Sequence, residues 1–230
     1  MKKEDLNSEL LNNLTTEINP QKDVLELIFD LLKTGLVVFV LAFVLRYFLI
    51  QPFLVDGQSM MPNYHNKEYL LVEKLSYLLN EPKRGDVVVF RYPKNPNISY
   101  IKRIIGLPNE TVIIKNDIIS VKNTDHPDGF QLDETYIPQD FTTSVFMGVS
   151  SDGAYQKSLK ENEYFVIGDN REHSSDSREW GALPKANIIG RAWLTLFPLD
   201  RISTHQRVSY PAESSISYYL LSPATATGRN

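Results

Sequence analysis

The 230-residue chain contains no cysteine, and this absence excludes several classes of site. Disulfide bonds, iron–sulfur clusters and zinc sites with thiolate ligands all require cysteine side chains. The four histidines are scattered, and no two of them have the spacing of a metal site. Acidic residues gather between positions 168 and 181, but their spacing does not match an EF-hand calcium loop. The sequence therefore predicts no metal centre.

A strongly basic segment is also missing. The formal net charge is −4, so the chain lacks the positive field that attracts nucleic acid. Internal repeats and low-complexity tracts are absent as well. The length suits one membrane segment followed by one domain of ordinary size. We therefore expect no nucleic-acid partner.

One long apolar run is present, at residues 31–50, and reads LLKTGLVVFVLAFVLRYFLI. Its length matches the ~20 residues that a helix needs to cross a bilayer. Lys33 and Arg46 lie near its ends, where long side chains can reach the membrane surface. A buried helix of a soluble core is rarely apolar on every face, and a cleaved signal peptide has a short basic leader. Residues 1–30 are long and contain many acids, so we expect an uncleaved anchor.

Lysine and arginine near the two ends of this run predict its orientation. Lys22 and Lys33 precede or begin the run, whereas residues 51–66 contain neither lysine nor arginine. Positive residues favour the cytoplasmic side. We therefore expect a cytoplasmic segment at residues 1–30 and an extracytoplasmic domain after the anchor. The plasma membrane and an internal membrane such as a thylakoid both fit this pattern.

After the anchor, short β-like runs alternate with Pro, Gly and Asn. The expected strands are residues 69–73, 86–92, 98–105, 110–115, 118–121, 163–167 and 189–196. Asn116-Asp117 is typical of a hairpin turn, and one short helix is expected at 74–79. The predicted fold class is mainly β, with antiparallel sheets packed together.

Changes in polarity and in the β-like pattern along the chain also predict its domain organisation. Residues 51–122 and 161–205 form the expected β core, and the more polar stretch 123–160 is expected to be an inserted smaller lobe. Residues 206–230 form a C-terminal tail. From about His205 onward the chain has few turn or core signals, and we expect it to be mobile.

Ser59 is a candidate nucleophile, in the stretch Gly57-Gln58-Ser59-Met60-Met61-Pro62. A serine hydroxyl needs a base to take its proton. His65 is the nearest histidine, but no signature accompanies it, and the Gly-x-Ser-x-Gly and Ser-x-x-Lys patterns are absent. The remaining hypothesis is a lysine base.

Lys102 is the candidate base. Lysine titrates near pH 10.4 in water, and burial in an apolar site lowers its pKa. On the expected strand 98–105, Tyr100, Lys102 and Ile104 share one face, where the lysine can lose its water. The alternative is a lysine at a sheet edge with its ammonium in solvent. Periodicity alone favours that alternative and does not select Lys102 over other lysines.

Four motifs occur in an order typical of one family. They are Gln51-Pro52-Phe53 leading to Ser59-Met60-Met61-Pro62; Arg84-Gly85-Asp86-Val87-Val88-Val89-Phe90; Lys102-Arg103-Ile104-Ile105-Gly106-Leu107-Pro108; and Gly168-Asp169-Asn170-Arg171 running to Ser174, Asp176-Ser177-Arg178 and Trp180-Gly181. With the anchor before them, they resemble bacterial type I signal peptidases, membrane-anchored Ser/Lys proteases that remove signal peptides. The resemblance covers about residues 31–201. Any one motif alone is weak, whereas the ordered set is specific.

The resemblance implies a role for five residues. Ser59 attacks the scissile carbonyl, and neutral Lys102 takes the serine's proton and later gives it to the leaving amine. Ser174 hydrogen-bonds and orients the lysine. Asp176 and Arg178 form an ion pair that braces the site. No metal or organic cofactor is implied, and the implied partners are preprotein signal peptides and the lipid bilayer.

The resemblance also implies substrate pockets and an inserted second β region. The positions that match the pockets are Phe53, Val55, Met60, Tyr64, Tyr100 and Ile101. They are mostly apolar and suit small side chains, such as alanine, at the first and third positions before the cut. Where the family pattern continues Met-Pro-Thr-Leu, this chain has Asn63 and Tyr64 after Pro62.

Half of the implied oxyanion hole departs from the family pattern. The Ser59 backbone N–H supplies one donor. Some members add a hydroxyl two residues earlier, where this chain has Gly57, so a side-chain donor is impossible there and the second donor stays open, with a backbone N–H as one candidate. Two other functions stay open: a self-cleaving Ser/Lys protease of the repressor type, and a membrane-tethered β-rich binding or assembly module without catalysis.

The anchor would hold the candidate serine close to the bilayer. Only eight residues separate Ile50 from Ser59, which limits the serine to roughly 30 Å from the membrane edge. We expect Phe53, Leu54, Met60 and Met61 to be exposed and to dip into the membrane interface.

Overall fold

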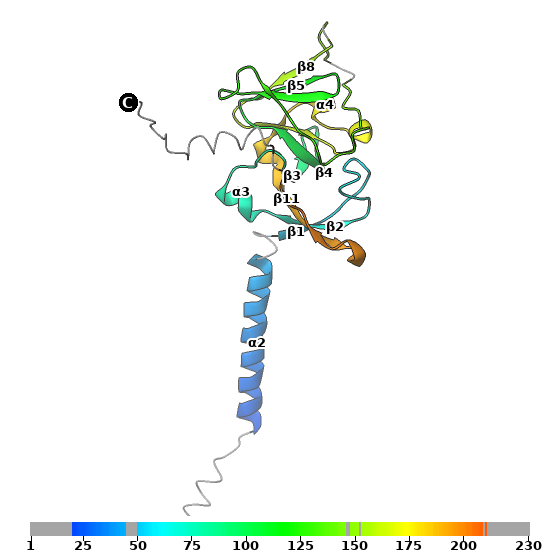
Figure 1. Cartoon of the computed structure of the whole chain (residues 1–230). Helices are drawn as coiled ribbons and strands as arrows, with labels where there is room; N and C mark the ends of the chain where they lie inside the picture. Colours follow the sequence, from blue (N-terminus) through cyan, green and yellow to red (C-terminus); the bar gives the residue numbers. More distant parts are fainter. Residues whose placement is uncertain (1–19, 45–49, 146–147, 152, 209, 211–230) are drawn as a thin grey trace, which may run out of the picture. The chain divides into compact units, whose positions relative to one another are not determined.

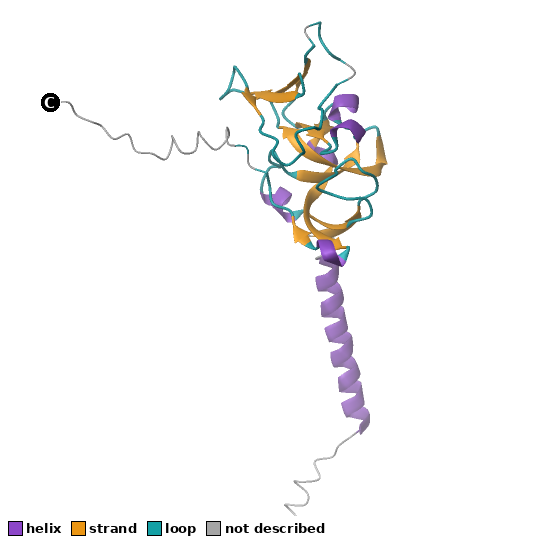
Figure 2. Ribbon diagram, turned by 45° about the vertical axis from the view of Figure 1, so that its right-hand side comes forward, coloured by secondary structure: helices purple, strands orange, loops and turns teal. Residues whose placement is uncertain are grey.

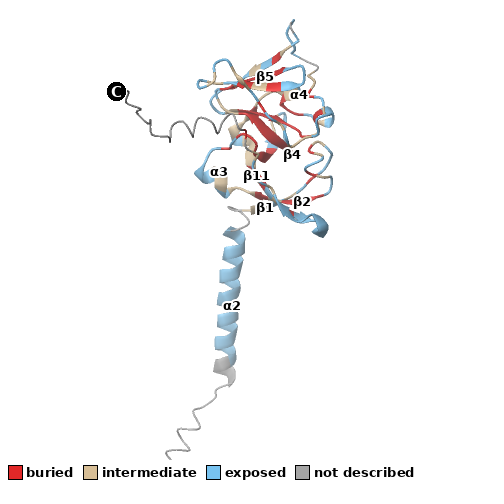
Figure 3. Cartoon of the chain, viewed as in Figure 1, coloured by how far each residue is buried: buried red, intermediate tan, exposed pale blue. Residues whose placement is uncertain are grey.

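The computed structural model describes residues 20–44, 50–145, 148–151, 153–208 and 210. The chain divides into two compact units, one with the long helix α2 (Pro20–Val44) and one with the strands. Within α2, Val24–Val44 is long and apolar enough to cross a membrane, and all its described side chains are exposed (Figure 3). An apolar helix with no buried face fits a membrane anchor.

This helix differs from the expected span of 31–50. It begins at Pro20, since proline suits the first turn of a helix, and its apolar segment begins at Val24, where Leu, Ile and Phe already alternate with Glu26 and Asp30. Ile50 is instead the first residue of strand β1 (Ile50–Leu54). Lys33 falls inside the apolar segment, and Arg46 lies outside the described residues.

The second unit is mainly antiparallel β (Figures 1 and 2). Its larger sheet has eight strands, in the order β1-β2-β11-β3-β4-β9-β10 with β12 beside β11; its smaller sheet has the order β7-β6-β5-β8. The strands are β1 (Ile50–Leu54), β2 (Tyr69–Glu73), β3 (Val87–Tyr92), β4 (Asn95–Gly106), β5 (Thr111–Lys115), β6 (Ile118–Lys122), β7 (Phe130–Gln131), β8 (Tyr155–Ser158), β9 (Glu163–Ile167), β10 (Leu183–Pro184), β11 (Ile188–Phe197) and β12 (Ser203–Thr204). The helices of this unit are α3 (Leu75–Leu79), α4 (Ser177–Trp180) and 3-10 turns at Arg171–His173, Lys185–Asn187 and Leu199–Arg201. Figure 1 shows β5 and β8 at one end of the unit and β1 and β2 at the other.

The seven expected strands are confirmed, two of them (β2 and β9) at their expected bounds. Asn116 and Asp117 both have positive φ, 51° and 64°, as the tight hairpin turn between β5 and β6 requires. The smaller sheet begins at β5, earlier than the lobe expected at 123–160, because β5 and β6 pair with the later strands β8 and β7. Those later strands are two to four residues long, too short for a pattern to reveal.

Two apolar clusters position the site. One lies between the sheets and joins Ile105 and Phe165 of the larger sheet to Val112 and Val121 of the smaller sheet. In Figure 3 the buried part of β4 runs through this unit. The other cluster packs β2, β3 and β11 against the turn that follows β1. That turn is therefore supported by core residues of the larger sheet.

The described residues from His205 onward make core contacts that the sequence did not indicate. Residues 205–208 and 210 lie against the β unit, and Tyr210 is only 1% exposed. Val208 and Tyr210 pack into the cluster between the sheets. The residues of the expected tail beyond Tyr210 lie outside the described residues.

Candidate active site

Ser59 and Lys102 meet although 43 positions separate them. Lys102 Nζ lies 2.7 Å from Ser59 Oγ, within hydrogen-bond distance. The same nitrogen donates a hydrogen bond of 2.9 Å to the Ile101 carbonyl. Ser59 comes from the turn after β1, which we call the nucleophile turn (residues 57–64), and Lys102 comes from β4. The pairing of hydroxyl and amine is the contact that a serine–lysine mechanism needs.

The sheet determines the burial of Lys102. Strand β4 lies between β3 and β9, so Lys102 is not at an edge, and it is only 4% exposed. Its Nζ lies 5.2 Å from the centre of the Tyr100 ring, the neighbour on its own face. Burial lowers the pKa of Lys102 to about 8, while the carboxylates of Asp176 and Asp169 oppose this shift. The alternative of a solvated lysine at a sheet edge is thereby excluded.

Asn170 holds the nucleophile turn at two points. Its backbone N–H donates to the Ser59 carbonyl at 3.0 Å, and its side-chain amide donates to the Gln58 carbonyl at 3.1 Å. Within the turn, Met61 N–H donates to the same Gln58 carbonyl at 3.1 Å. Sequence reasoning gave Asn170 no role, although it stands in the Gly-Asp-Asn-Arg motif.

Gly57 begins this turn with a φ of +112°, a conformation that side-chain-bearing residues rarely adopt. Its N–H donates to the Asn66 side chain at 2.9 Å. Gly57 therefore offers an oxyanion neither a side-chain donor nor its own N–H while that bond is made.

Gly168 lies directly behind the serine. A Cβ at this position would be 2.4 Å from the Ser59 carbonyl oxygen and 2.2 Å from Ser174 Oγ, closer than atoms can pack. Ser174 therefore stands beside the nucleophile turn. Its Oγ is buried and has no hydrogen-bond partner among the described residues, so the bond to Lys102 that the resemblance implies is not formed here. Lys102 uses the Ile101 carbonyl instead.

Asp176 and Arg178 are joined by two hydrogen bonds, of 2.9 Å from Nε and 2.8 Å from a terminal nitrogen. Asp176 is fully buried and also accepts the Gly168 N–H at 3.0 Å. Arg178 reaches on to the Arg171 carbonyl at 2.7 Å. The pair therefore holds together the loop that carries Gly168 and Ser174.

A second buried ion pair braces the turn from the other side. Arg103 contacts both Asp169 oxygens, at 2.8 and 2.6 Å. The Asn63 side chain donates to the same carboxylate at 2.9 Å. Asn63 stands where this chain departs from the family pattern. Its side chain provides a hydrogen bond between the nucleophile turn and the loop that carries Asp169.

A groove of about 390 Å³ opens beside the serine–lysine pair. Its walls are Phe53, Leu54, Asp56, Gly57, Gln58, Ser59, Ser99, Tyr100, Ile101, Lys102, His173 and Ser175. Of the six expected pocket residues, Phe53, Tyr100 and Ile101 line this groove. The cavity is thus mostly apolar on the side of β1 and β4 and ends at the reactive pair.

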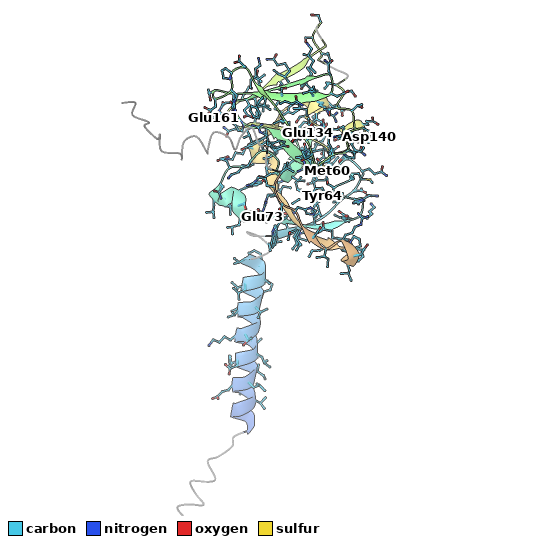
Figure 4. All side chains as sticks on the ribbon, in the orientation of Figure 1. Met60, Tyr64, Glu73, Glu134, Asp140 and Glu161 are labelled. Atoms are coloured by element: carbon cyan, nitrogen blue, oxygen red, sulfur yellow. The ribbon has the colours of Figure 1, made fainter. Side chains whose placement is uncertain are left out.

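The other three expected pocket residues lie elsewhere. Val55, Met60 and Tyr64 are at most 3% exposed and belong to the apolar cluster beneath the nucleophile turn. Figure 4 shows Met60 and Tyr64 inside the β unit. Their side chains turn toward the core because the turn has no strand alternation to present them to the groove. They support the groove from beneath and do not form its surface.

No group of three or more His, Cys, Asp or Glu side chains that could hold a metal occurs among the described residues.

Comparison with known proteins adds family relationships. A family model described as signal peptidase, peptidase S26, matches residues 28–197. The signal peptidase I of Bacillus licheniformis is 35% identical over 177 residues, which cover 76% of this chain and 91% of that protein. The probable signal peptidase I-1 of Synechocystis sp. is 36% identical over 175 residues, covering 72% of this chain and 81% of that protein. A crystal structure of a signal peptidase I from Enterococcus faecalis V583 is 30% identical, with a TM-score of 0.38 and coverage of 49% and 97%. The segment matched by the family model contains every residue of the groove.

Proposed function

The chain belongs to the signal peptidase family, peptidase S26, whose members are serine endopeptidases, and on this premise we propose how it works. The protein is a membrane-bound endopeptidase that removes N-terminal signal peptides with Ser59 as nucleophile and Lys102 as general base. The contact of 2.7 Å between these two side chains carries the proposal. Asp176 and Arg178 brace the site, and Ser174, whose buried Oγ has no partner among the described residues, is the candidate to orient Lys102.

The proposed reaction balances its protons within the pair. Ser59 Oγ attacks the scissile carbonyl while Lys102 Nζ takes the hydroxyl proton. The resulting ammonium gives that proton to the leaving amine, and an ester of Ser59 remains. The same lysine then takes a proton from a water molecule, whose oxygen attacks the ester carbonyl; the C–Oγ bond breaks, and the lysine returns its proton to Ser59 Oγ.

Burial makes this cycle feasible near neutral pH. With a pKa of about 8, about one lysine in ten is neutral at about pH 7, against about one in 3,000 at a pKa of 10.5. The gain in reactive base is therefore on the order of 300-fold. A lysine at a sheet edge would forgo that gain.

The apolar lining of the groove supports a proposed preference for small residues before the cut. Phe53, Tyr100 and Ile101 line it together with the reactive pair. A preprotein with alanine at the first and third positions before the cut should be cleaved there by the purified chain in detergent. The matched preprotein with phenylalanine at the first position should react about a hundredfold more slowly, because its side chain does not fit. Mass spectrometry of the products locates the cut; equal rates for both substrates would contradict the proposed groove.

The two alternatives predict different outcomes in the same assay. A self-cleaving protease shortens its own chain and leaves the preprotein intact. A binding or assembly module leaves both intact. Cleavage of the preprotein while the enzyme chain keeps its mass excludes both alternatives.

A row of exposed apolar side chains suggests how the β unit meets the lipid. Leu54, Tyr69 and Phe197 stand opposite one another at the ends of β1, β2 and β11, and the Tyr69 and Phe197 rings are 6.3 Å apart. Leu199, 74% exposed, follows in the next turn. Because Leu54 also lines the groove, the row reaches the groove's mouth. We propose that this row dips into the membrane interface.

The expected interfacial set changes accordingly. Leu54 is exposed as expected, but Met60 is buried, and Phe53 and Met61 are only partly exposed. Phe53 packs against the core cluster, so replacing it would disturb folding as well as any lipid contact.

Replacing Phe197 and Leu199 together with serine should weaken liposome binding of a chain shortened to residues 48–230. We expect a loss of about tenfold, because two large apolar side chains no longer leave water. Ile118→Ser is the matched control, since Ile118 is also exposed but stands on the β5–β6 hairpin at the other end of the unit. Flotation with liposomes measures both. An equal loss in the control, or none in the double variant, rules the row out.

We also propose that α2 is the membrane anchor, with its amino-terminal side in the cytoplasm, because Lys22 lies just before the apolar segment Val24–Val44 while Lys33 falls within it. Enzyme and signal peptide would then share one membrane plane, which raises their effective concentration. Protease added outside intact cells should digest the β unit and spare the opposite end; the reverse pattern contradicts this orientation.

A further inference from the structure

The described residues 205–208 and 210 form a segment that we call the strap. It follows β12 and lies beyond residue 197, where the family match ends. The family relationship therefore gives it no role. Its contacts, however, lead back to the nucleophile turn from two directions.

The first contact is at His205. The ring of His205 lies 4.3 Å from that of Tyr64, the last residue of the nucleophile turn. Tyr64 N–H donates to the Met60 carbonyl at 2.9 Å, which closes the turn just after Ser59. His205 is itself held in place, because its N–H donates to the Trp193 carbonyl and its Nε2 lies 2.7 Å from Thr195 Oγ1. The ring of His205 is therefore held in place by these two hydrogen bonds and packs against Tyr64 at the end of the nucleophile turn.

The middle of the strap is fitted closely to the start of β3. Arg207 contacts both oxygens of the buried Asp86, at 2.6 and 3.1 Å. Gly85 next to it has a φ of +85°, and a Cβ there would lie 2.4 Å from the Val208 carbonyl oxygen. Only glycine leaves room for the strap at this point. The approach is therefore a specific feature of the fold.

The second contact is at Tyr210. Its hydroxyl donates to that of Tyr136 at 3.4 Å, a long hydrogen bond, and its ring is buried between the sheets. The Tyr136 carbonyl accepts the Asn63 side chain at 2.9 Å, and its ring lies under the Arg103 guanidinium at 4.1 Å. Tyr136 also contacts Glu134, which Figure 4 places in the same unit. Through Tyr136 the strap reaches Asn63, on the same turn as Tyr64.

We propose that the strap is a positioning element for the reaction, which fixes the nucleophile turn at Asn63 and Tyr64 and so keeps Ser59 on Lys102. The inference rests on the proposed function for its catalytic consequence. A displacement of about 1 Å between reacting groups can cost on the order of a hundredfold in rate. A strap that only adds stability would leave the rate of the folded enzyme unchanged.

Three variants of the full chain test this. His205→Ala removes the ring on Tyr64, His205→Phe keeps a ring there, and Gln206→Ala changes an exposed neighbour on the same strap. We expect kcat for preprotein cleavage to fall about tenfold in His205→Ala with KM within about twofold. His205→Phe should recover most of the loss, and Gln206→Ala should match the unaltered chain. All rates are normalised to the folded fraction measured by circular dichroism.

The pH profile separates positioning from stability. If the turn loosens, Lys102 gains water, and the ascending limb of kcat/KM should move to higher pH in His205→Ala. A change in melting temperature with kcat, KM and this limb unaltered would overturn the inference.

Hydrogen exchange tests the strap without relying on activity. The amides of Met61 and Tyr64 are bonded within the turn and should exchange faster in His205→Ala than in Gln206→Ala. Unchanged exchange at both amides counts against the strap. If the unaltered chain cleaves no preprotein, the proposed function fails, while this exchange result still decides whether the strap holds the turn.

Discussion

Replacing Lys102 with methionine should abolish preprotein cleavage while the chain stays folded. Methionine has a similar length and no charge, so the buried site of Lys102 keeps its packing. The amine is the hydrogen-bond partner of Ser59 Oγ among the described residues, so without it the hydroxyl loses the group that takes its proton. We expect kcat to fall by roughly 10⁴-fold or more in Lys102→Met. The kcat of Ser59→Ala should fall by a similar factor, because both steps of the reaction need the serine and the lysine together. Rates of product formation under single-turnover conditions measure this.

Lys94→Met is the matched control, because Lys94 is an exposed lysine in the turn that enters β4. It should keep nearly the full rate. The double variant Ser59→Ala with Lys102→Met should be no slower than either single variant, because groups that act as a unit do not add. Substantial cleavage by either single variant would refute the dyad.

The pH dependence of kcat/KM in the unaltered enzyme should report the titration of Lys102. The base acts only when neutral, so kcat/KM rises as the pH passes the pKa of Lys102 and levels off above it. Because burial places that pKa at about 8, the midpoint of the limb should lie near pH 8 and not near 10.5. A limb close to the ordinary lysine value would mean that Lys102 is solvated in the working enzyme.

The sequence predicts the β architecture well because its signals are local. Strands β2 and β9 have their expected bounds, and the Asn116-Asp117 turn has the expected positive φ values. The burial of Lys102 is not a local property, since it depends on β3 and β9 lying on both sides of β4. For this reason periodicity could not choose this lysine, and only the order of the motifs indicated it.

Local sequence patterns could not identify the residues that hold Ser59 in place. Asn170 and Asn63 act through side-chain amides that reach other segments, and an asparagine in a loop has many ordinary uses. Met60 and Tyr64 lie in a turn without a period, so nothing in the sequence says which of them face the core. The contacts of Tyr210 depend on packing between the two sheets, far from it in sequence.

Gly168→Ala should have the next largest effect after the dyad. Gly168 is buried, and its added methyl would lie 2.4 Å from the Ser59 carbonyl oxygen, so the backbone of the nucleophile turn or of the loop must move. Either movement strains the hydrogen bond from Asn170 N–H to the same carbonyl. We expect a rate loss of about a hundredfold and a loss of stability of about 1–3 kcal/mol. Kinetics and chemical denaturation on the same preparation measure the two effects.

Two further variants separate a steric clash with the Ser59 carbonyl from the general effect of adding a methyl group to a glycine. Gly35→Ala makes the same change in α2, where nothing beyond the chain neighbours and the helix's own backbone lies within 4 Å, and should be silent in both assays. Adding Ser174→Ala to Gly168→Ala removes the hydroxyl at 2.2 Å but leaves the Ser59 carbonyl in the way. The double variant should therefore stay much slower than Ser174→Ala alone. If it matches Ser174→Ala, the methyl acts through Ser174, and the backbone of the nucleophile turn is not what Gly168 protects.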